Sequence, residues 1–183
     1  METVKLIQNN KVIKNAIIVF LGTILLTISA KVKIPFYPVP MTMQTFVVIF
    51  LGMCFGYKLG LATVALYLIE GIVGIPVFSN SPEKGVGMIY FTGPTMGYLL
   101  GFIIAVYMAG KFYFNKNYLL NFVKIFFSVL PIYVLGLIWL GILIGWDKPI
   151  FDLGAKPFLL AEIFKIILIV IISMKVDFFK KFI

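Results

Sequence analysis

Long runs of apolar residues, separated by segments rich in Lys, Pro and Asn, are the feature that most limits what this chain can fold into. A helix needs roughly 20 apolar residues to cross the hydrocarbon core of a bilayer. Only helices and closed barrels satisfy their backbone polar groups there. The pattern therefore predicts an all-α integral membrane protein, a single transmembrane domain of about six helices over residues 1–183. The approximate predicted spans are 15–30, 42–57, 59–75, 93–112, 119–145 and 157–175.

The composition excludes a water-soluble fold. Hydrophobic residues make up 62% of the chain and charged residues 13%, and the mean hydropathy is +1.09. Soluble proteins are roughly 45–50% apolar. The formal net charge of +9 is compatible with a nucleic-acid partner, but the lysines lie between the apolar runs and form no basic face. We therefore expect membrane lipid, and no nucleic acid, around this chain.

The sequence lacks the motifs of metal and nucleotide chemistry. It contains no His, which is the commonest general base near neutral pH and a frequent metal ligand. The pair Gly110-Lys111 is followed by Phe112, where a phosphate-binding loop needs Ser or Thr. The sequence thus predicts no metal site, no cofactor and no ATPase activity of its own.

The lysines predict an orientation, because Lys and Arg near span ends stay on the cytoplasmic side of bacterial-type membranes. With both termini inside, ten lysines are cytoplasmic, five are outside, and Lys165 lies within the last span. We therefore predict a multi-pass protein of the bacterial cell membrane with both termini cytoplasmic. The inner lysines are Lys5, Lys11, Lys14, Lys58, Lys111, Lys116, Lys124, Lys175, Lys180 and Lys181; the outer ones are Lys31, Lys33, Lys84, Lys148 and Lys156.

A signal peptide is the alternative interpretation of the first run, 15–30. Basic residues precede this run, and the small residues Ser29 and Ala30 end it. We favour a retained span, because it keeps the lysine-rich tails on one side of the membrane.

Two ionisable residues in the last run are the strongest candidates for a functional site. Glu162 and Lys165 are three residues apart and therefore share one face of a helix. A charged side chain at mid-span costs roughly 2.5–3.5 kcal/mol on insertion scales. The two residues are either an ion pair that eases insertion or a clamp for a small ligand that carries both an anionic group and N–H donors.

Other polar and aromatic residues have two interpretations each. Glu70 lies near the end of the third run, and we favour a structural role for it. Asn80 lies in a loop where it either forms a turn or binds a ligand amide. Phe78 and Tyr90 either form the wall of a ligand pocket or lie at the membrane interface, where Tyr is common.

Three stretches in chain order resemble the BioY family, the biotin-capturing S components of energy-coupling factor (ECF) vitamin transporters. The first is Ile34-Pro-Phe-Tyr-Pro-Val-Pro-Met-Thr-Met-Gln-Thr45, followed by Leu51-Gly-Met-Cys-Phe-Gly56. The second runs from Tyr67 to Phe78, and the third is Gly93-Pro-Thr-Met-Gly-Tyr-Leu-Leu-Gly-Phe102. Near the C-terminus the family pattern Pro-Phe-x-Pro-Gly-Asp-x-x-Lys is replaced by Pro157-Phe-Leu-Leu-Ala-Glu-Ile-Phe-Lys165. Glu162 thus takes the place of Asp and reaches one methylene further.

The resemblance implies an S-component-like bundle that binds biotin with high affinity. Lys165 would hold the carboxylate or another acceptor, Glu162 the ureido N–H groups and Asn80 the ureido carbonyl. The resemblance also makes Thr42 and Gln44 lid or pocket residues, beside Phe78 and Tyr90 as wall residues.

The resemblance further implies partners, namely a membrane-embedded coupling subunit and two ATPase subunits. The family docks to the coupling subunit through small residues in its first span, often spaced Ala-x-x-x-Ala. This chain offers Gly22, Thr23 and Thr27 there.

Three other functions stay open at this point. The chain could be an S component for another small vitamin or a biotin precursor. It could also be an intramembrane enzyme that uses Glu162 and Lys165 as acid and base, although no nucleophile with a base or metal accompanies them. The third is an accessory or assembly subunit with no ligand.

Overall fold

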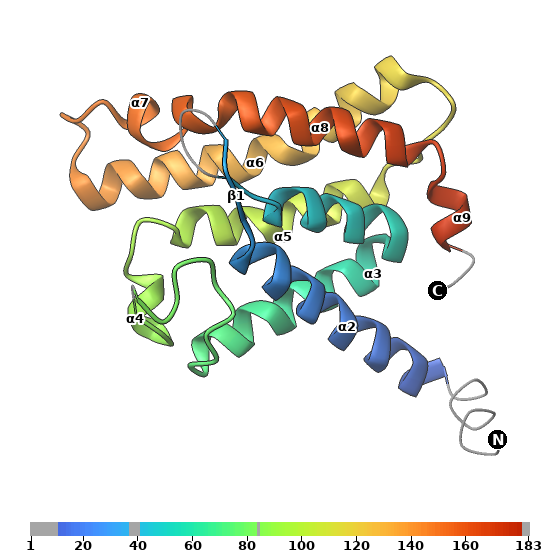
Figure 1. Ribbon diagram of the computed structural model, residues 1–183, viewed down its shortest axis with the longest axis horizontal. Coiled ribbons are helices and arrows are strands. Elements are labelled where there is room, and N and C mark those ends of the chain that lie inside the picture. Colours follow the sequence, from blue (N-terminus) through green and yellow to red (C-terminus); the bar gives the residue numbers. More distant parts are fainter. Residues whose placement is uncertain (1–10, 37–40, 84, 181–183) are drawn as a thin grey trace.

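The computed structural model describes residues 11–36, 41–83 and 85–180, which form a bundle of helices (Figure 1). Short elements connect the longer helices: α4 (Met88–Phe91), α7 (Ile150–Gly154), the 3₁₀ turn η1 (Lys156–Phe158), α9 (Val176–Lys180), and the antiparallel pair β1 (Lys33–Ile34) and β2 (Met41–Thr42). The longer helices are α2 (Lys11–Lys31), α3 (Gln44–Ile72), α5 (Met96–Lys111), α6 (Tyr118–Ile144) and α8 (Leu159–Ser173).

Helix α3 is broken into two halves at Gly56. The backbone of Gly56 has φ 72° and ψ 173°, a conformation that glycine adopts without a Cβ clash. A Cβ added to Gly110 of α5 would lie 2.4 Å from the backbone nitrogen of Tyr57, so α5 passes directly against the break. The two halves correspond to the predicted spans 42–57 and 59–75.

The helical segments run back and forth between two ends of the bundle (Figure 1). The most extensive packing joins α3 to α5 and α5 to α6, while α2 packs on α3, and α8 contacts both α6 and α3. The start of α2, the break in α3 and helix α9 lie at one end, and α4 and α7 lie at the other (Figure 1). The segment after α3 and the segment after α6 are therefore brought to the same end.

The helices approach closely where glycines face a neighbour. A Cβ on Gly97 would lie 2.3 Å from the carbonyl oxygen of Leu135, and one on Gly101 would lie 2.4 Å from the Cα of Ile132. Small residues at such positions let membrane helices pack backbone to backbone. Many large apolar side chains of α2, α6 and α8 point outward, among them Phe20, Leu25, Phe126, Leu130 and Ile167.

Side chains fasten the loops at the α4 and α7 end of the bundle. The Lys31 ammonium donates to the carbonyl oxygen and the hydroxyl of Ser81. Trp139 donates from its indole nitrogen to the Gly93 carbonyl at 2.9 Å, and the Tyr98 hydroxyl donates to the Gly154 carbonyl at 2.7 Å. These bonds hold the loops in place over the helix ends.

The helical fold predicted from the sequence is confirmed, but the number of crossings is not. Among the described residues, α2, α3 and α6 are long and apolar enough by length and composition to cross a membrane, although α3 is broken at Gly56. Helix α5 is apolar but shorter, and α8 has 15 residues. Six crossings therefore stay a prediction.

Several boundaries differ from the predicted ones. Helix α2 begins at Lys11 rather than at 15, and α8 covers 159–173 rather than 157–175. The loops also contain β1, β2, α4 and α7, which the sequence did not predict. Of the residues used for orientation and lid, Lys5, Lys84, Lys181 and 37–40 lie outside the described residues.

Candidate ligand-binding site

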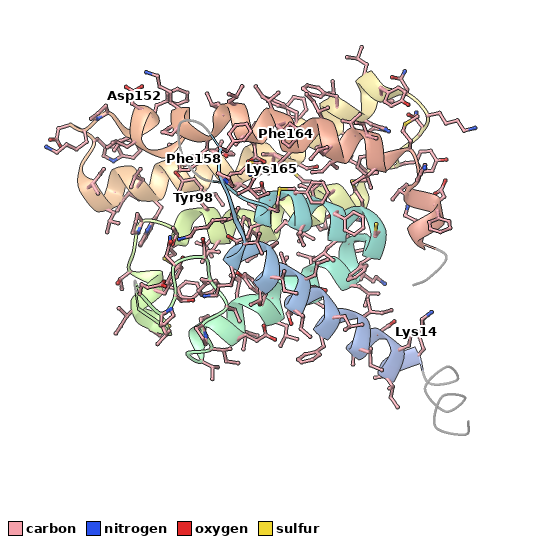
Figure 2. The ribbon with its side chains drawn as sticks, in the orientation of Figure 1. Lys14, Tyr98, Asp152, Phe158, Phe164 and Lys165 are labelled. Atoms are coloured by element: carbon pink, nitrogen blue, oxygen red, sulfur yellow. The ribbon has the colours of Figure 1, made fainter. Side chains whose placement is uncertain are left out.

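Glu162 and Lys165 form a buried ion pair in the first turns of α8. The Lys165 Nζ lies 2.8 Å from the Glu162 Oε2, and the side chains are 7% and 6% exposed, respectively. The turn η1, which contains Pro157, precedes α8 and leads the chain into the bundle. Lys165 lies toward the middle of the molecule, whereas Lys14 projects at the end where α2 begins (Figure 2). The spacing of three residues therefore produces the shared helix face that the sequence predicts.

Two hydroxyl groups from other helices complete the polar network. Thr45, at the start of α3, lies 3.1 Å from the Glu162 Oε2 and 2.7 Å from the Lys165 Nζ. Its hydroxyl can donate to the carboxylate while it accepts from the ammonium. Tyr133 of α6 donates its hydroxyl to the same Oε2 at 3.0 Å. Residues of α3, α6 and α8 thus converge on one carboxylate oxygen.

The second oxygen of Glu162 has no hydrogen-bond partner. Among the described residues, the Oε1 of Glu162 is the buried side-chain polar atom that lacks one. An unsatisfied buried acceptor costs about 1–3 kcal/mol, and more when it is charged. The carboxylate is thus held by one oxygen, and the acceptor capacity of the other is unused among the described residues.

Lys165 is more fully satisfied than Glu162. Its ammonium has three N–H groups, which are directed to the Glu162 carboxylate, to the Thr45 hydroxyl and to the Thr42 carbonyl. The last of these is long, at 3.4 Å. A ligand acceptor can therefore take the place of the Thr42 carbonyl at little loss.

Gln44 belongs to a different network, which joins α3 to the loop after it. Its amide nitrogen donates to the Tyr67 hydroxyl at 2.9 Å, and Tyr67 donates to the Val77 carbonyl at 3.1 Å. Gln44 and Tyr67 are both buried. Gln44 therefore holds the two halves of α3 and residue 77 together beside the site.

Phe78 and Tyr90 lie in an aromatic cluster rather than against the ion pair. The rings of Phe78 and Tyr90 are stacked with centroids 4.7 Å apart, and Tyr67 and Phe91 meet Phe78 edge on at 5.3 and 5.5 Å. Phe78 is 1% exposed and lies on Gly71, where an added Cβ would come 2.0 Å from the ring. The cluster anchors the loop that follows α3.

Known proteins are similar to this chain in sequence and in fold. The model of the BioY family matches residues 2–181. The chain belongs to the BioY family. The family member described as the probable biotin transporter BioY of Pyrococcus horikoshii is 36% identical over 87% of this chain and 94% of that protein. The biotin transporter BioY of Thermotoga maritima is 32% identical over 84% of this chain and 89% of that protein.

A solved structure shares the fold of this BioY-family chain. It is the crystal structure of the S-component for biotin from an ECF-type ABC transporter, with a TM-score of 0.73 and 23% sequence identity over 92% of this chain and 93% of that one. The S-component-like bundle predicted from the sequence is thereby confirmed as the fold.

The structure brings together only part of the site predicted for this BioY-family chain. Glu162 and Lys165 meet, and Thr42 joins them through its backbone carbonyl. Asn80 is half-buried, and none of the hydrogen bonds of the described residues joins it to this network. Its place beside a ligand stays a prediction, as do the places of Gln44, Phe78 and Tyr90.

The small residues of α2 are occupied within the BioY-family chain itself. The Thr23 hydroxyl lies 3.0 Å from the Glu70 Oε1 and 2.9 Å from the Phe20 carbonyl, and its one proton is donated to either acceptor. A Cβ on Gly22 would lie 2.5 Å from the Thr63 side chain. Gly22 and Thr23 are both buried against α3, and the Thr27 hydroxyl donates to the Thr23 carbonyl. Gly22 and Thr23 therefore face α3 in this structure. Their contact with a coupling subunit stays a prediction, as does that of Thr27.

Thr45 and Tyr133 are site residues that sequence reasoning did not single out. Thr45 ends the first stretch that resembles the BioY family, directly after Gln44, so the motif carried a signal for it. Tyr133 lies inside the apolar run 119–145. A hydroxyl within a membrane span needs a hydrogen-bond partner. This requirement could have indicated that Tyr133 contacts another polar residue.

Proposed function

We propose that this chain is the membrane-embedded, high-affinity biotin-binding subunit of an ECF transporter and mediates biotin uptake. The observation that carries the proposal is the buried Glu162, whose Oε2 accepts from three groups while its Oε1 has no partner among the described residues. Membership of the BioY family supports it, since relatives with 36% and 32% identity are described as biotin transporters.

The chemistry of biotin matches the open positions of this network. Its ureido group has two N–H donors and a carbonyl, and its chain ends in a carboxylate. A ureido N–H can donate to the Glu162 Oε1, and a ligand acceptor can replace the Thr42 carbonyl at Lys165. Charged hydrogen bonds in a water-poor site are roughly twice as strong as neutral ones. Glu162 and Lys165 thus act as a paired clamp, with Asn80 proposed for the ureido carbonyl.

The proposed function includes a coupling subunit and two ATPase subunits that energise uptake. The accessible part of α2 for a coupling subunit is the exposed apolar side around Thr27, because Gly22 and Thr23 pack on α3. Transport rather than catalysis is the activity of the named relatives. The paired, hydrogen-bonded state of Glu162 and Lys165 gives an acid–base enzyme less support.

We propose that the chain lies in the bacterial cell membrane with both termini cytoplasmic. Lysines gather near the end where α2 begins, at which Lys14 projects (Figure 2). Lys58 follows the break in α3, the Lys111 ammonium lies 4.1 Å from the centroid of the Tyr57 ring beside that break, and Lys175 directly precedes α9. Excess Lys marks the cytoplasmic side. Cysteine-accessibility labelling at position 14, compared with position 148, tests this orientation.

Isothermal titration of the detergent-solubilised full chain tests the proposed ligand. We expect biotin to bind below micromolar concentration, and Glu162→Gln to weaken binding at least ten-fold. The control Asp152→Asn removes the acid of an exposed ion pair with Lys156 and should leave binding unchanged.

A competition series separates biotin from related substrates. Desthiobiotin, thiamine and riboflavin are titrated against bound biotin, and we expect only desthiobiotin to compete. No binding of biotin below micromolar concentration would refute the proposal, and tighter binding of another vitamin would reassign the substrate. Uptake retained after Lys165→Ala in the intact complex would instead favour an accessory subunit.

A further inference from the structure

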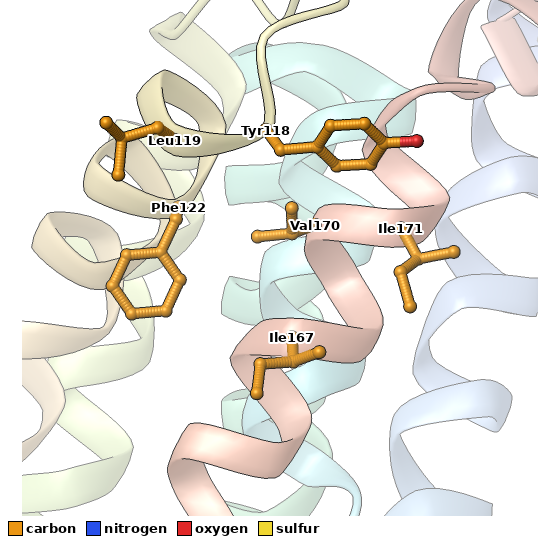
Figure 3. A pocket seen from close by; sticks show the side chains of 6 residues that line it. All are labelled: Tyr118, Leu119, Phe122, Ile167, Val170 and Ile171. Atoms are coloured by element: carbon orange, nitrogen blue, oxygen red, sulfur yellow. The ribbon is translucent and has the colours of Figure 1, made fainter.

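An apolar groove lies on the outside of the bundle between the start of α6 and the end of α8 (Figure 3). Its volume is about 400 Å³, within the range of roughly 300–1,000 Å³ of ligand pockets. Its lining is entirely apolar in surface. The residues that form it are Tyr118, Leu119, Phe122, Ile167, Val170 and Ile171.

The groove is open to the surroundings of the bundle rather than to its interior. Val170 is buried and forms the floor, while Ile167, Ile171 and Leu119 are exposed. In a membrane these side chains meet lipid, and a crevice that lipid does not fill would forfeit dispersion contacts along both walls. An acyl chain is the flexible apolar group that can fill it.

The groove ends at a basic segment of the chain. The Asn121 side-chain amide donates to the Asn115 carbonyl and to the Ser173 hydroxyl, each at 2.8 Å. This side chain ties the segment before α6 to the last turn of α8. Lys116 directly follows Asn115, and Lys175 comes two residues after Ser173. Both lysines are exposed. Lys116 is two residues from Tyr118 and Lys175 is four residues from Ile171, so both positive charges are close in sequence to the groove lining.

We propose that this groove holds an acyl chain of an anionic phospholipid whose phosphate is bound by Lys116 and Lys175. The apolar lining matches the chain, and the two lysines match the charge of the headgroup. Each basic residue near an anionic lipid surface contributes about five-fold in affinity.

A lipid fits the groove better than a helix of another protein. The lining residues of each helix span only 118–122 and 167–171, about one turn, whereas packed helices meet over several turns. Two lysines at the mouth also favour an anion over the apolar side of a helix. The site is separate from Glu162, which lies in the first turn of α8.

Native mass spectrometry of the detergent-purified full chain tests this site. The protein is titrated with phosphatidylglycerol and with phosphatidylcholine of identical acyl chains. We expect tighter retention of phosphatidylglycerol, and a loss of about five-fold for Lys116→Gln and for Lys175→Gln. The control Lys148→Gln, at the opposite end of the bundle, should retain the lipid as the unchanged chain does.

A second pair of variants tests the groove itself. Ile171→Trp fills it and should lower the retention of both lipids several-fold. Ile163→Trp is the matched control, since Ile163 is 49% exposed on the same helix and Ile171 is 57% exposed, but only Ile171 lines the groove. Circular dichroism establishes that each variant is folded, and if Ile171→Trp does not fold, the lysine variants decide.

Four outcomes would overturn the proposal. Equal retention of the two lipids would exclude a binding site for the anionic headgroup. An unchanged lipid affinity in both lysine variants would exclude it as well. A dimer that Ile171→Trp dissociates would make a second copy of the chain the occupant. Retention of glycerol phosphate as strong as that of phosphatidylglycerol would show that no acyl chain is bound.

Discussion

Replacing Glu162 with Gln removes one charge from a buried pair and preserves its shape. The Oε2 that is lost as a charged acceptor takes bonds of 2.8 Å from Lys165, 3.0 Å from Tyr133 and 3.1 Å from Thr45. Hydrogen bonds to charged groups contribute about 1.5–3 kcal/mol and neutral ones about 0.5–1.5 kcal/mol. Three weakened bonds and an uncompensated ammonium together predict a loss of about 3–5 kcal/mol, the usual result of breaking a buried pair from one side.

Thermal unfolding in detergent measures this loss. For a chain of 150–250 residues, 1 kcal/mol shifts the Tm by about 2–4 °C, so Glu162→Gln should lower it by about 6–20 °C. The fluorescence of the tryptophans, which include Trp139 in α6, reports the transition. The control Asp152→Asn breaks an exposed pair, which contributes only about 0–1 kcal/mol, and should lower the Tm by at most about 4 °C.

The double variant Glu162→Gln/Lys165→Met tests whether the unpaired charge of Lys165 causes the loss of stability. It leaves no buried charge without a partner, so it should recover at least half of the lost Tm, because replacing both members of a buried pair is often neutral. Biotin binding should stay lost, since the clamp is gone. A Tm for Glu162→Gln within about 2 °C of the unchanged chain would refute the reasoning. A double variant no more stable than the single one would refute it as well.

Three further substitutions test individual contacts. Tyr133→Phe removes one bond to the buried carboxylate and should weaken biotin binding about five- to ten-fold while lowering the Tm by a few degrees; titration with unchanged affinity would exclude Tyr133 as a positioning residue. Gly71→Ala drives a methyl group into the ring of Phe78 and should destabilise the fold by about 1–3 kcal/mol, measured as a lower Tm. Thr23→Val loses the hydrogen bond to the α3 carboxylate and should lower the Tm more than Thr27→Val, which loses only a bond within α2; equal shifts would contradict a bond between the two helices.

Local sequence spacing was enough to predict the centre of the site. Glu162 and Lys165 share a turn, and any helix through them brings the two side chains to one face. The polar partners depend instead on tertiary packing, since Thr45 is 117 residues and Tyr133 is 29 residues from Glu162. Neither separation corresponds to the repeat of a helix or a strand, so neither contact can be predicted from the sequence pattern. The first stretch that resembles the BioY family includes Thr45, but the resemblance did not indicate its role.

The helices were more predictable than the connections between them. Apolar runs gave the positions of α5 and α6 to within a few residues, because lipid exposure demands continuous apolar sequence. The pairing of β1 with β2 and the turn of α4 depend on backbone bonds in short polar segments, where composition indicates only a loop. The contact between Thr23 and Glu70 was not predicted for a related reason, since a small residue can serve an inner or an outer contact equally well.

The break at Gly56 decides on which side of the bundle the rest of the chain emerges. A continuous helix over the 29 residues of α3 would be about 43 Å long, longer than the hydrocarbon core of roughly 30 Å. It would deliver Ile72 to the opposite end and invert every later segment, so that α8 would run the other way and Glu162 would enter the bundle from the wrong end. The break at one glycine thus sets the direction of every later helix, and with it the side of the membrane that the candidate site faces.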